Sequence, residues 1–436
     1  MSDLKKTLGL GLLTFYGTGM IIGAGIYSII GSAAGIAGES LWMSFILSAA
    51  ISLLTGLSYA EMATMYPKAG AEYVYLKAAF PRRPIIAAGV GWMVAIGLAT
   101  TAAAVAVAFA GYLNHFVSAP IMLVAFGLMV FFTLINILGI KESSWTNVIF
   151  TLIEISGLII FIYLGIRHES FGDPIMALPH GGILPASALL IFSYFGFENI
   201  ANLAEEVHNP GKVIPRAIFL SLGVSTLIYL LVSFSALALL SPAELAASSK
   251  PLADAVGKIS PRLAGILSGI ALFSTANTAL IALLITSRVL FGMARGGDLP
   301  KVLSHTHPIR NTPWIASFVS LIFASAFLPL GNVEALGNLS SMSTMVAFIG
   351  VSIALLVLRK THPHLERPYR VPFSVEGIPV LPIASIISIG TLLMQFSLST
   401  YLWSGVGLTV FLFVYFILKL INGDKIADVD NSLNLE

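Results

Sequence analysis

The sequence predicts an all-α integral membrane protein with twelve transmembrane helices, and three observations lead to this fold class. The chain of 436 residues is 57% hydrophobic and only 10% charged, whereas a soluble protein keeps roughly a quarter of its residues charged. Long apolar runs recur along the whole chain, and basic residues gather in every second loop between them. The lipid bilayer must therefore be the solvent of this protein.

The twelve spans follow from apolar runs of about 18 or more residues, the length needed to cross a bilayer. Polar or proline-containing loops separate these runs. We place the spans at residues 9–36, 41–65, 84–112, 119–140, 144–166, 184–205, 214–240, 262–292, 312–330, 334–358, 378–397 and 400–421. Residues 424–436 then form a polar cytoplasmic tail.

The basic residues indicate how the chain is oriented in the membrane. With the N-terminus inside, only four of the 23 Lys and Arg residues fall in outer loops, namely Arg167, Lys250, Lys258 and Arg262. Cytoplasmic loops carry the excess of Lys and Arg in membrane proteins. We therefore expect both termini to be cytoplasmic and the protein to reside in the plasma (cytoplasmic) membrane.

The centre of the first span is rich in glycine, from Gly17 to Gly25. Glycine lets the backbone leave a helix at little steric cost, and broken backbone is tolerated in a bilayer where it lines a cavity. The run predicts either an interrupted helix or close packing of another helix against Gly19 and Gly23.

The sixth span repeats this feature and favours the interrupted helix. Its centre, residues 192–199, places a glycine and a carboxylate at membrane depth. Interrupted helices at positions one and six are typical of an inverted repeat of five spans. The sequence thus predicts a 5+5 inverted repeat, with residues 9–166 and 184–358 as the repeats and residues 378–421 as two appended helices.

Two loops are expected to be helical themselves. Residues 67–77 are typical of a short amphipathic helix at the cytoplasmic surface. Outside, Ser241 followed by Pro242 predicts a helix N-cap with proline at the first helical position, opening a helix that could act as a lid. Near the end of the second span, Glu61 is expected to pack against the adjacent loop.

Five segments, in the same order along the chain, resemble a known family: residues 17–27, 59–75, 195–218, 295–300 and 367–372. The family is that of the amino acid–polyamine–organocation permeases, and the resemblance runs nearly end to end. It implies that residues 1–423 form a transporter domain that moves amino acids by alternating access. Helices one and six would hold the substrate while the bundle around them rocks.

An amino-acid site must satisfy both a carboxylate and an ammonium group. The N–H groups at the start of the second half of helix one suit the carboxylate, and by resemblance its cradle is Gly23, Ala24 and Gly25. The resemblance places the ammonium on carbonyl groups of residues in helices one and six, namely Ile21, Phe192, Ser193 and Phe195. Phe192 also matches an aromatic gate, although it could be an ordinary core or lipid-facing residue.

Two carboxylates at membrane depth are candidates for coupling or gating. Glu198 could sense protons, or it could cap N–H groups freed by the helix break. Glu154 lies mid-span in helix five, where a carboxylate costs at least about 2.5 kcal/mol and indicates function. It could carry a proton, help to bind Na⁺ with Ser274 or Thr275, or bond to Asn277 in a structural role, and we favour the proton.

Several classes of function are not supported by the sequence. The net charge is only +2, and no basic run interleaves with aromatic residues, so nucleic acid is not an expected partner. The absence of cysteine excludes a disulfide-linked partner chain. The eight histidines lie in loops, so we expect no metal site. No catalytic arrangement is visible, so we expect neither an enzyme nor a cofactor.

The sequence thus predicts a secondary transporter for neutral amino acids, coupled to H⁺, with the lipid bilayer and a small-molecule substrate as its partners. Coupling to Na⁺ is the alternative for the ion. The runner-up function is an exchanger of amino acids or amines without ion coupling. A sensor that binds amino acids on the same fold without transporting them, and a channel, are further alternatives.

Overall fold

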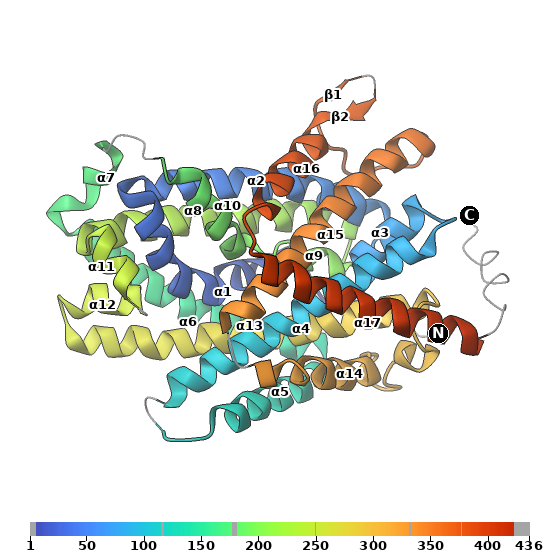
Figure 1. The fold of residues 1–436 in the computed structure, drawn as a ribbon, viewed down its shortest axis with the longest axis horizontal. Helices are drawn as coiled ribbons and strands as arrows, with labels where there is room; N and C mark the ends of the chain where they lie inside the picture. Colours follow the sequence, from blue (N-terminus) through green and yellow to red (C-terminus); the bar gives the residue numbers. More distant parts are fainter. Residues whose placement is uncertain are drawn as a thin grey trace.

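The computed structural model describes residues 6–114, 117–176, 181–248, 250–330, 333–375 and 377–422. The expected tail, residues 424–436, lies outside this part. Figure 1 shows the elements, which are α1 (Leu10–Ala37), α2 (Leu41–Met65), α3 (Ala71–Ala79), α4 (Pro84–Asn114), α5 (Ile121–Leu138), α6 (Ile140–Ile166), α7 (Asp173–Met176), α8 (Ile183–Leu190), α9 (Asn199–Asn202), α10 (Pro210–Leu239), α11 (Pro242–Ala247), α12 (Pro251–Gly257), α13 (Pro261–Arg295), α14 (Trp314–Ser325), α15 (Val333–Thr361), β1 (Ser374–Val375), β2 (Ile378–Pro379), α16 (Val380–Leu393) and α17 (Leu398–Asn422).

The helices confirm an all-α membrane protein. Among the described residues, 10 helical segments are long and apolar enough to cross a bilayer. Two shorter apolar segments, Trp314–Leu330 and Val380–Leu393, occupy the positions expected for the ninth and eleventh spans. The count of twelve spans therefore stays a prediction. The strands β1 and β2 form only a two-residue antiparallel hairpin that pairs Ser374 with Pro379.

Some helix boundaries differ from those expected. The seventh long helix, α10, begins at Pro210 rather than at residue 214, because proline is well suited to the first helical position. The residue before it, Asn209, adopts a left-handed conformation with φ of 51° that turns the chain into the helix. The sixth segment ends at Asn202 rather than at residue 205.

The core of the bundle surrounds α1 and the sixth segment. Helix α1 packs against α6, α8, α10 and α13, and α13 packs in turn along α4. In the apolar segment of α13, 83% is buried inside the protein, whereas only 22% of the apolar segment of α17 is. Helix α17 therefore lies at the periphery. Short helices mark the two ends: α7, α11 and α12 lie together at one end, and α3 lies at the other (Figure 1). We call these the α11 end and the α3 end.

The helix α3 is more deeply placed than an amphipathic surface helix would be. It packs between α4 and α15, and its Glu72 is buried at 2% exposure. The carboxylate of Glu72 accepts hydrogen bonds from the Tyr59 hydroxyl (3.1 Å) and from the Asn202 amide (3.0 Å). Burial raises the pKa of Glu72, although these hydrogen bonds oppose the rise.

The helix α11 begins as its sequence predicts. The Ser241 hydroxyl accepts a hydrogen bond from the Glu244 N–H, and the Glu244 carboxylate accepts one from the Ser241 N–H. This reciprocal arrangement is a capping box. The helix packs against α1, but a role as a lid stays a prediction.

Two buried carboxylates, those of Glu61 and Glu206, form ion pairs at the α3 end. Glu61 accepts two hydrogen bonds from Arg359 (2.7 and 2.6 Å) and one from Arg367 (3.0 Å). The expectation that Glu61 packs against its adjacent loop is therefore wrong, because its partners belong to α15 and to the loop after α15. Arg288, which is 0% exposed, pairs with Glu206 at 3.0 Å.

Candidate functional site

Both the first and the sixth segments are interrupted near their centres. Within α1, Gly23 has φ of −5° and ψ of −163°, which are not helical values. In the sixth segment, α8 continues into a 3₁₀ turn, Ile191–Tyr194, after which Phe195 is extended and Gly196 has φ of 132°. The helix resumes only at Asn199 as α9.

The two interruptions lie against each other. A Cβ atom built on Gly196 would lie 2.7 Å from Cγ of Met20 and 2.9 Å from the backbone N of Ile21. No L-residue fits such a distance against backbone, and the positive φ of Gly196 disfavours a side chain in any case. Glycine is thus required at this position because the backbones of the two segments meet there.

Tyr229 of α10 ties the two interruptions together, although the sequence reasoning did not single it out. Its hydroxyl lies 2.6 Å from the carbonyl oxygen of Ile21 and 2.8 Å from that of Ser193. A hydroxyl has one proton, so these two carbonyls share it. The one available signal was a tyrosine at mid-span, where a buried hydroxyl needs a partner.

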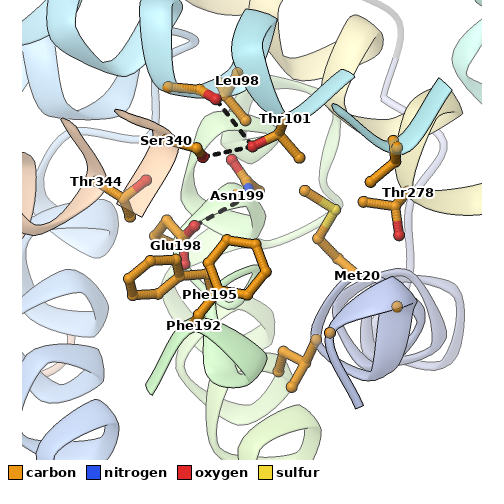
Figure 2. A pocket seen from close by; sticks show the side chains of 15 residues that line it. Met20, Leu98, Thr101, Phe192, Phe195, Glu198, Asn199, Thr278, Ser340 and Thr344 are labelled. Carbon is orange, nitrogen blue, oxygen red and sulfur yellow. Dashed lines mark hydrogen bonds between the residues drawn. The ribbon is translucent and has the colours of Figure 1, made fainter. Parts of the chain in front are cut away.

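A cavity of about 60 Å³ lies beside this junction, enough for a few ordered water molecules. Figure 2 shows Thr101 and Ser340 across the cavity from Phe192 and Phe195. Its lining residues come from α1, α4, the sixth segment, α13 and α15: Met20, Ile21, Gly23, Gly25, Gly97, Leu98, Thr101, Val105, Phe192, Phe195, Glu198, Asn199, Thr278, Ser340 and Thr344.

Most of the residues predicted to bind substrate border this cavity. Ile21, Gly23 and Gly25 line it from α1, whereas the side chain of Ala24 lies outside the part of the chain that the structure describes. Phe192 and Phe195 also line it, and their rings meet edge to face with centroids 5.8 Å apart.

The residue Ser193 lies just behind the wall of the cavity, 1% exposed. Its carbonyl oxygen accepts from Tyr229, as the Ile21 carbonyl oxygen does. The Phe192 carbonyl oxygen accepts a hydrogen bond from the Phe195 N–H at 3.2 Å. Three of the four carbonyls expected to hold an ammonium group thus each have a protein donor already.

The carboxylate of Glu198 reaches both the cavity and the break in the sixth segment. One oxygen accepts the Gly196 N–H at 2.8 Å, and the other accepts the Asn199 amide at 3.3 Å. This is the geometry of the capping role considered for Glu198. Both oxygens therefore have donors without any cation.

Glu154 lies away from the cavity, in a polar cluster between α6 and α13. Its side chain is 0% exposed, and one oxygen accepts a hydrogen bond from the Ser274 hydroxyl. The other oxygen has no hydrogen-bond partner among the described residues. The carbonyl oxygen of Ser274 accepts from Thr278 (3.1 Å), which lines the cavity. Glu154 is thus linked to the cavity through α13.

The other members of this cluster bond to one another, and the Asn277 side chain also lies close enough to the Glu154 carboxylate to interact with it. The Asn277 amide oxygen accepts from the Asn147 amide at 2.8 Å, and its amide nitrogen donates to Thr151 at 3.2 Å. The Thr275 hydroxyl donates to carbonyls of its own helix. Of the hydroxyls considered with Glu154, the structure places only that of Ser274 in contact with it.

The polar residues of α4, α15 and α9 that line the cavity were not identified from the sequence. Thr101, Ser340 and Thr344 lie in α4 and α15, and Asn199 follows the break in the sixth segment. A single Ser or Thr in a long apolar span does not indicate which way its side chain points. Within the described residues, no cluster of three or more His, Cys, Asp or Glu could hold a metal ion.

Comparison with known proteins places this architecture in a family. The profile of the amino acid permease family matches residues 8–427. The chain is 30% identical to the branched-chain amino acid permease BcaP of Bacillus subtilis, over 95% of this chain and 93% of the relative. It is 30% identical to the methylthioribose transporter of Bacillus subtilis, over 88% of this chain and 87% of the relative.

A third relative from Bacillus subtilis, the glutamate/serine transporter AimA, is 28% identical over 87% of this chain and 76% of the relative. These relatives are transporters and not enzymes. The match over nearly the whole chain confirms the resemblance that the motifs indicate. The chain belongs to the amino acid permease family.

Proposed function

We propose that this protein is a secondary active transporter that carries a neutral amino acid by alternating access, in symport with a proton. The observation that carries the proposal is the cavity at the junction of two interrupted helices. In transporters, substrate sites lie where broken helices present backbone groups near the midplane of the bilayer. Such groups suit the carboxylate and ammonium that all α-amino acids share.

The two ends of the substrate are assigned to different segments. The second half of α1, at Gly23, Ala24 and Gly25, receives the carboxylate, because the start of a helix favours negative charge. The ammonium group lies near the carbonyl oxygens of Ile21 and of the sixth segment. A carbonyl oxygen has two lone pairs, so the bond from Tyr229 leaves one for the substrate.

A neutral substrate fits the charges around the cavity. No Lys or Arg is among the described residues that line it, and both oxygens of Glu198 already have donors. The named relatives carry branched-chain amino acids, methylthioribose, or glutamate and serine. The comparisons therefore do not choose the substrate, and the proposal rests on the cavity.

The proton is assigned to Glu154. Among the described residues, one oxygen of this buried carboxylate has no hydrogen-bond partner and no Lys or Arg pairs with it, which favours the neutral, protonated form. The Ser274–Thr278 contact connects it to the substrate cavity. Na⁺ bound by Glu154 and Ser274 is the alternative. The proposal includes twelve spans in a 5+5 inverted repeat, both termini in the cytoplasm and a place in the plasma membrane.

Transport by purified protein in liposomes tests the proposal. Uptake of radiolabelled neutral amino acids should exceed equilibrium when the pH outside is lower than inside, and Glu154→Gln should abolish this accumulation. Glu39→Gln, which changes an exposed carboxylate, is the matched control and should retain it. A Na⁺ gradient in place of the proton gradient tests the alternative ion.

Three other results would contradict the proposal in different ways. Flux that needs substrate inside the liposome and ignores both gradients identifies an exchanger. Binding without any flux identifies a sensor. If Glu154→Gln still accumulates the amino acid, Glu154 does not carry the coupled proton, but the proposal that the protein is a transporter stands.

A further inference from the structure

We propose that the wall of the cavity opposite α1 is a subsite for a small side chain that carries a hydroxyl or an amide group. The substrates would then be serine, threonine or asparagine rather than branched-chain or cationic amino acids. This inference rests on the proposed function, because it assumes that the carboxylate and ammonium of the substrate lie against the interrupted helices.

The position of this wall makes it the side-chain subsite. Gly23 and Gly25 border the cavity from α1, and residues of α4, α15 and the start of α9 line it with those of α13 and of the turn before α9. A substrate held by its backbone groups at α1 must point its side chain away from that helix. Figure 2 shows Thr101, Ser340 and Asn199 gathered on this opposite side.

The hydrogen bonds in this wall leave an acceptor facing the cavity. The Thr101 hydroxyl donates its single proton to the Gly97 carbonyl oxygen at 2.9 Å. The 2.5 Å contact between Thr101 and Ser340 must then be donated by Ser340. Ser340 has used its own proton in that bond, and its oxygen retains a lone pair that can accept the hydroxyl or amide proton of a substrate.

Further polar atoms in the same wall lack protein partners. The Asn199 amide donates to Glu198 at 3.3 Å, but its oxygen makes no hydrogen bond to any described residue, and neither does the Thr344 hydroxyl. Asn199 is 2% exposed and Ser340 is 3% exposed. A substrate in the cavity would cover these atoms, and a polar atom buried without a partner is costly, so a side chain that hydrogen-bonds here is favoured over an alkyl one.

The size of the cavity and the charges around it further restrict which substrate side chains can bind. The cavity of about 60 Å³ is bounded by the bulky side chains of Met20, Leu98 and Val105 and by the two phenylalanines. These leave little room for a long side chain. A cationic side chain would need an unpaired carboxylate, but Glu198 already bonds to Gly196 and Asn199.

Pairs of isosteric amino acids test the subsite. Threonine and valine differ only by a hydroxyl in place of a methyl group, and a site built to bind a hydroxyl rejects the analogue that lacks it. We expect threonine to inhibit uptake of labelled L-serine at a concentration at least about tenfold lower than valine does. Thermal stabilisation of the detergent-solubilised protein by each amino acid measures the same ratio without requiring flux.

Variants of the wall identify the group responsible. Ser340→Ala should bring the threonine-to-valine ratio close to one, whatever the absolute rate of uptake. Ser341→Ala is the matched control, because its hydroxyl donates to the Gly337 carbonyl of its own helix and does not line the cavity. That control should keep the wild-type ratio.

The possible results separate the two proposals. If valine matches threonine, or if lysine or arginine competes best, the polar subsite is overturned while amino-acid transport stands. An unchanged ratio in Ser340→Ala also overturns the role of Ser340. If no amino acid is taken up and none stabilises the protein, the proposed function fails and the subsite fails with it.

Discussion

The hydroxyl of Tyr229 offers the sharpest perturbation of the junction, because Tyr229→Phe removes it and leaves the ring. The hydroxyl lies 2.6 Å and 2.8 Å from the carbonyl oxygens of Ile21 and Ser193, and all three residues are at most 2% exposed. Leaving such buried acceptors without their donor costs about 1–3 kcal/mol. If half of that cost is lost from the free energy of substrate binding, binding weakens roughly two- to tenfold, because about 1.4 kcal/mol corresponds to tenfold.

The assay combines the KM for uptake into liposomes with the melting temperature of the solubilised protein. Tyr194→Phe is the matched control, since its buried hydroxyl also donates to a backbone carbonyl, that of Phe45 in α2 at 3.1 Å, but does not link the two interruptions to each other. Both variants should melt at a lower temperature, and only Tyr229→Phe should raise KM. Equal KM values for the two variants and the wild type would refute the reasoning.

Three further predictions concern the framework around the site. Glu61→Gln removes the buried carboxylate that Arg359 and Arg367 share and should lower the free energy of unfolding by about 3–5 kcal/mol, whereas Glu244→Gln at an exposed pair should change it far less; equal melting temperatures would contradict this. Gly196→Ala forces a Cβ to within 2.7 Å of Met20 and should abolish substrate binding measured by thermal stabilisation, so wild-type binding would show that the two interruptions do not meet. The raised pKa of Glu72 means that protonation stabilises the folded protein; this contribution is complete below the ordinary pKa of about 4.5 and is lost as the pH rises through the folded pKa. Lowering the pH from about 7 to about 5 should therefore raise the melting temperature of the wild type relative to Glu72→Gln, and a constant difference would contradict the assignment.

The interruptions of the two helices could be predicted because their signal is local. A glycine within an apolar span marks a place where the backbone can leave the helix, and the structure puts the irregular dihedral angles at Gly23 and Gly196. Ile21 and Phe192, which line the cavity, were named by the family resemblance and not by this local signal. Charged residues at membrane depth, such as Glu154, were also conspicuous against their apolar surroundings.

The other walls of the cavity could not be predicted because they depend on which residues the fold brings together. Thr101 and Ser340 are 239 residues apart, and Tyr229 and Ile21 are 208 apart. Nothing in an apolar span shows which way one hydroxyl points. The partners of Glu61 were missed for the same reason, since Arg359 lies 298 residues further along the chain.

The claim that the cavity holds the substrate can be tested directly because the chain contains no cysteine. A single cysteine introduced as Thr344→Cys lines the cavity, and one introduced as Lys301→Cys lies on the exposed surface as a control. The measurement is the rate at which a small thiol reagent labels each variant with and without a transported amino acid. The account predicts that the amino acid slows labelling of Thr344→Cys and leaves Lys301→Cys unchanged. Equal labelling of Thr344→Cys with and without an amino acid that is still transported would place the substrate elsewhere.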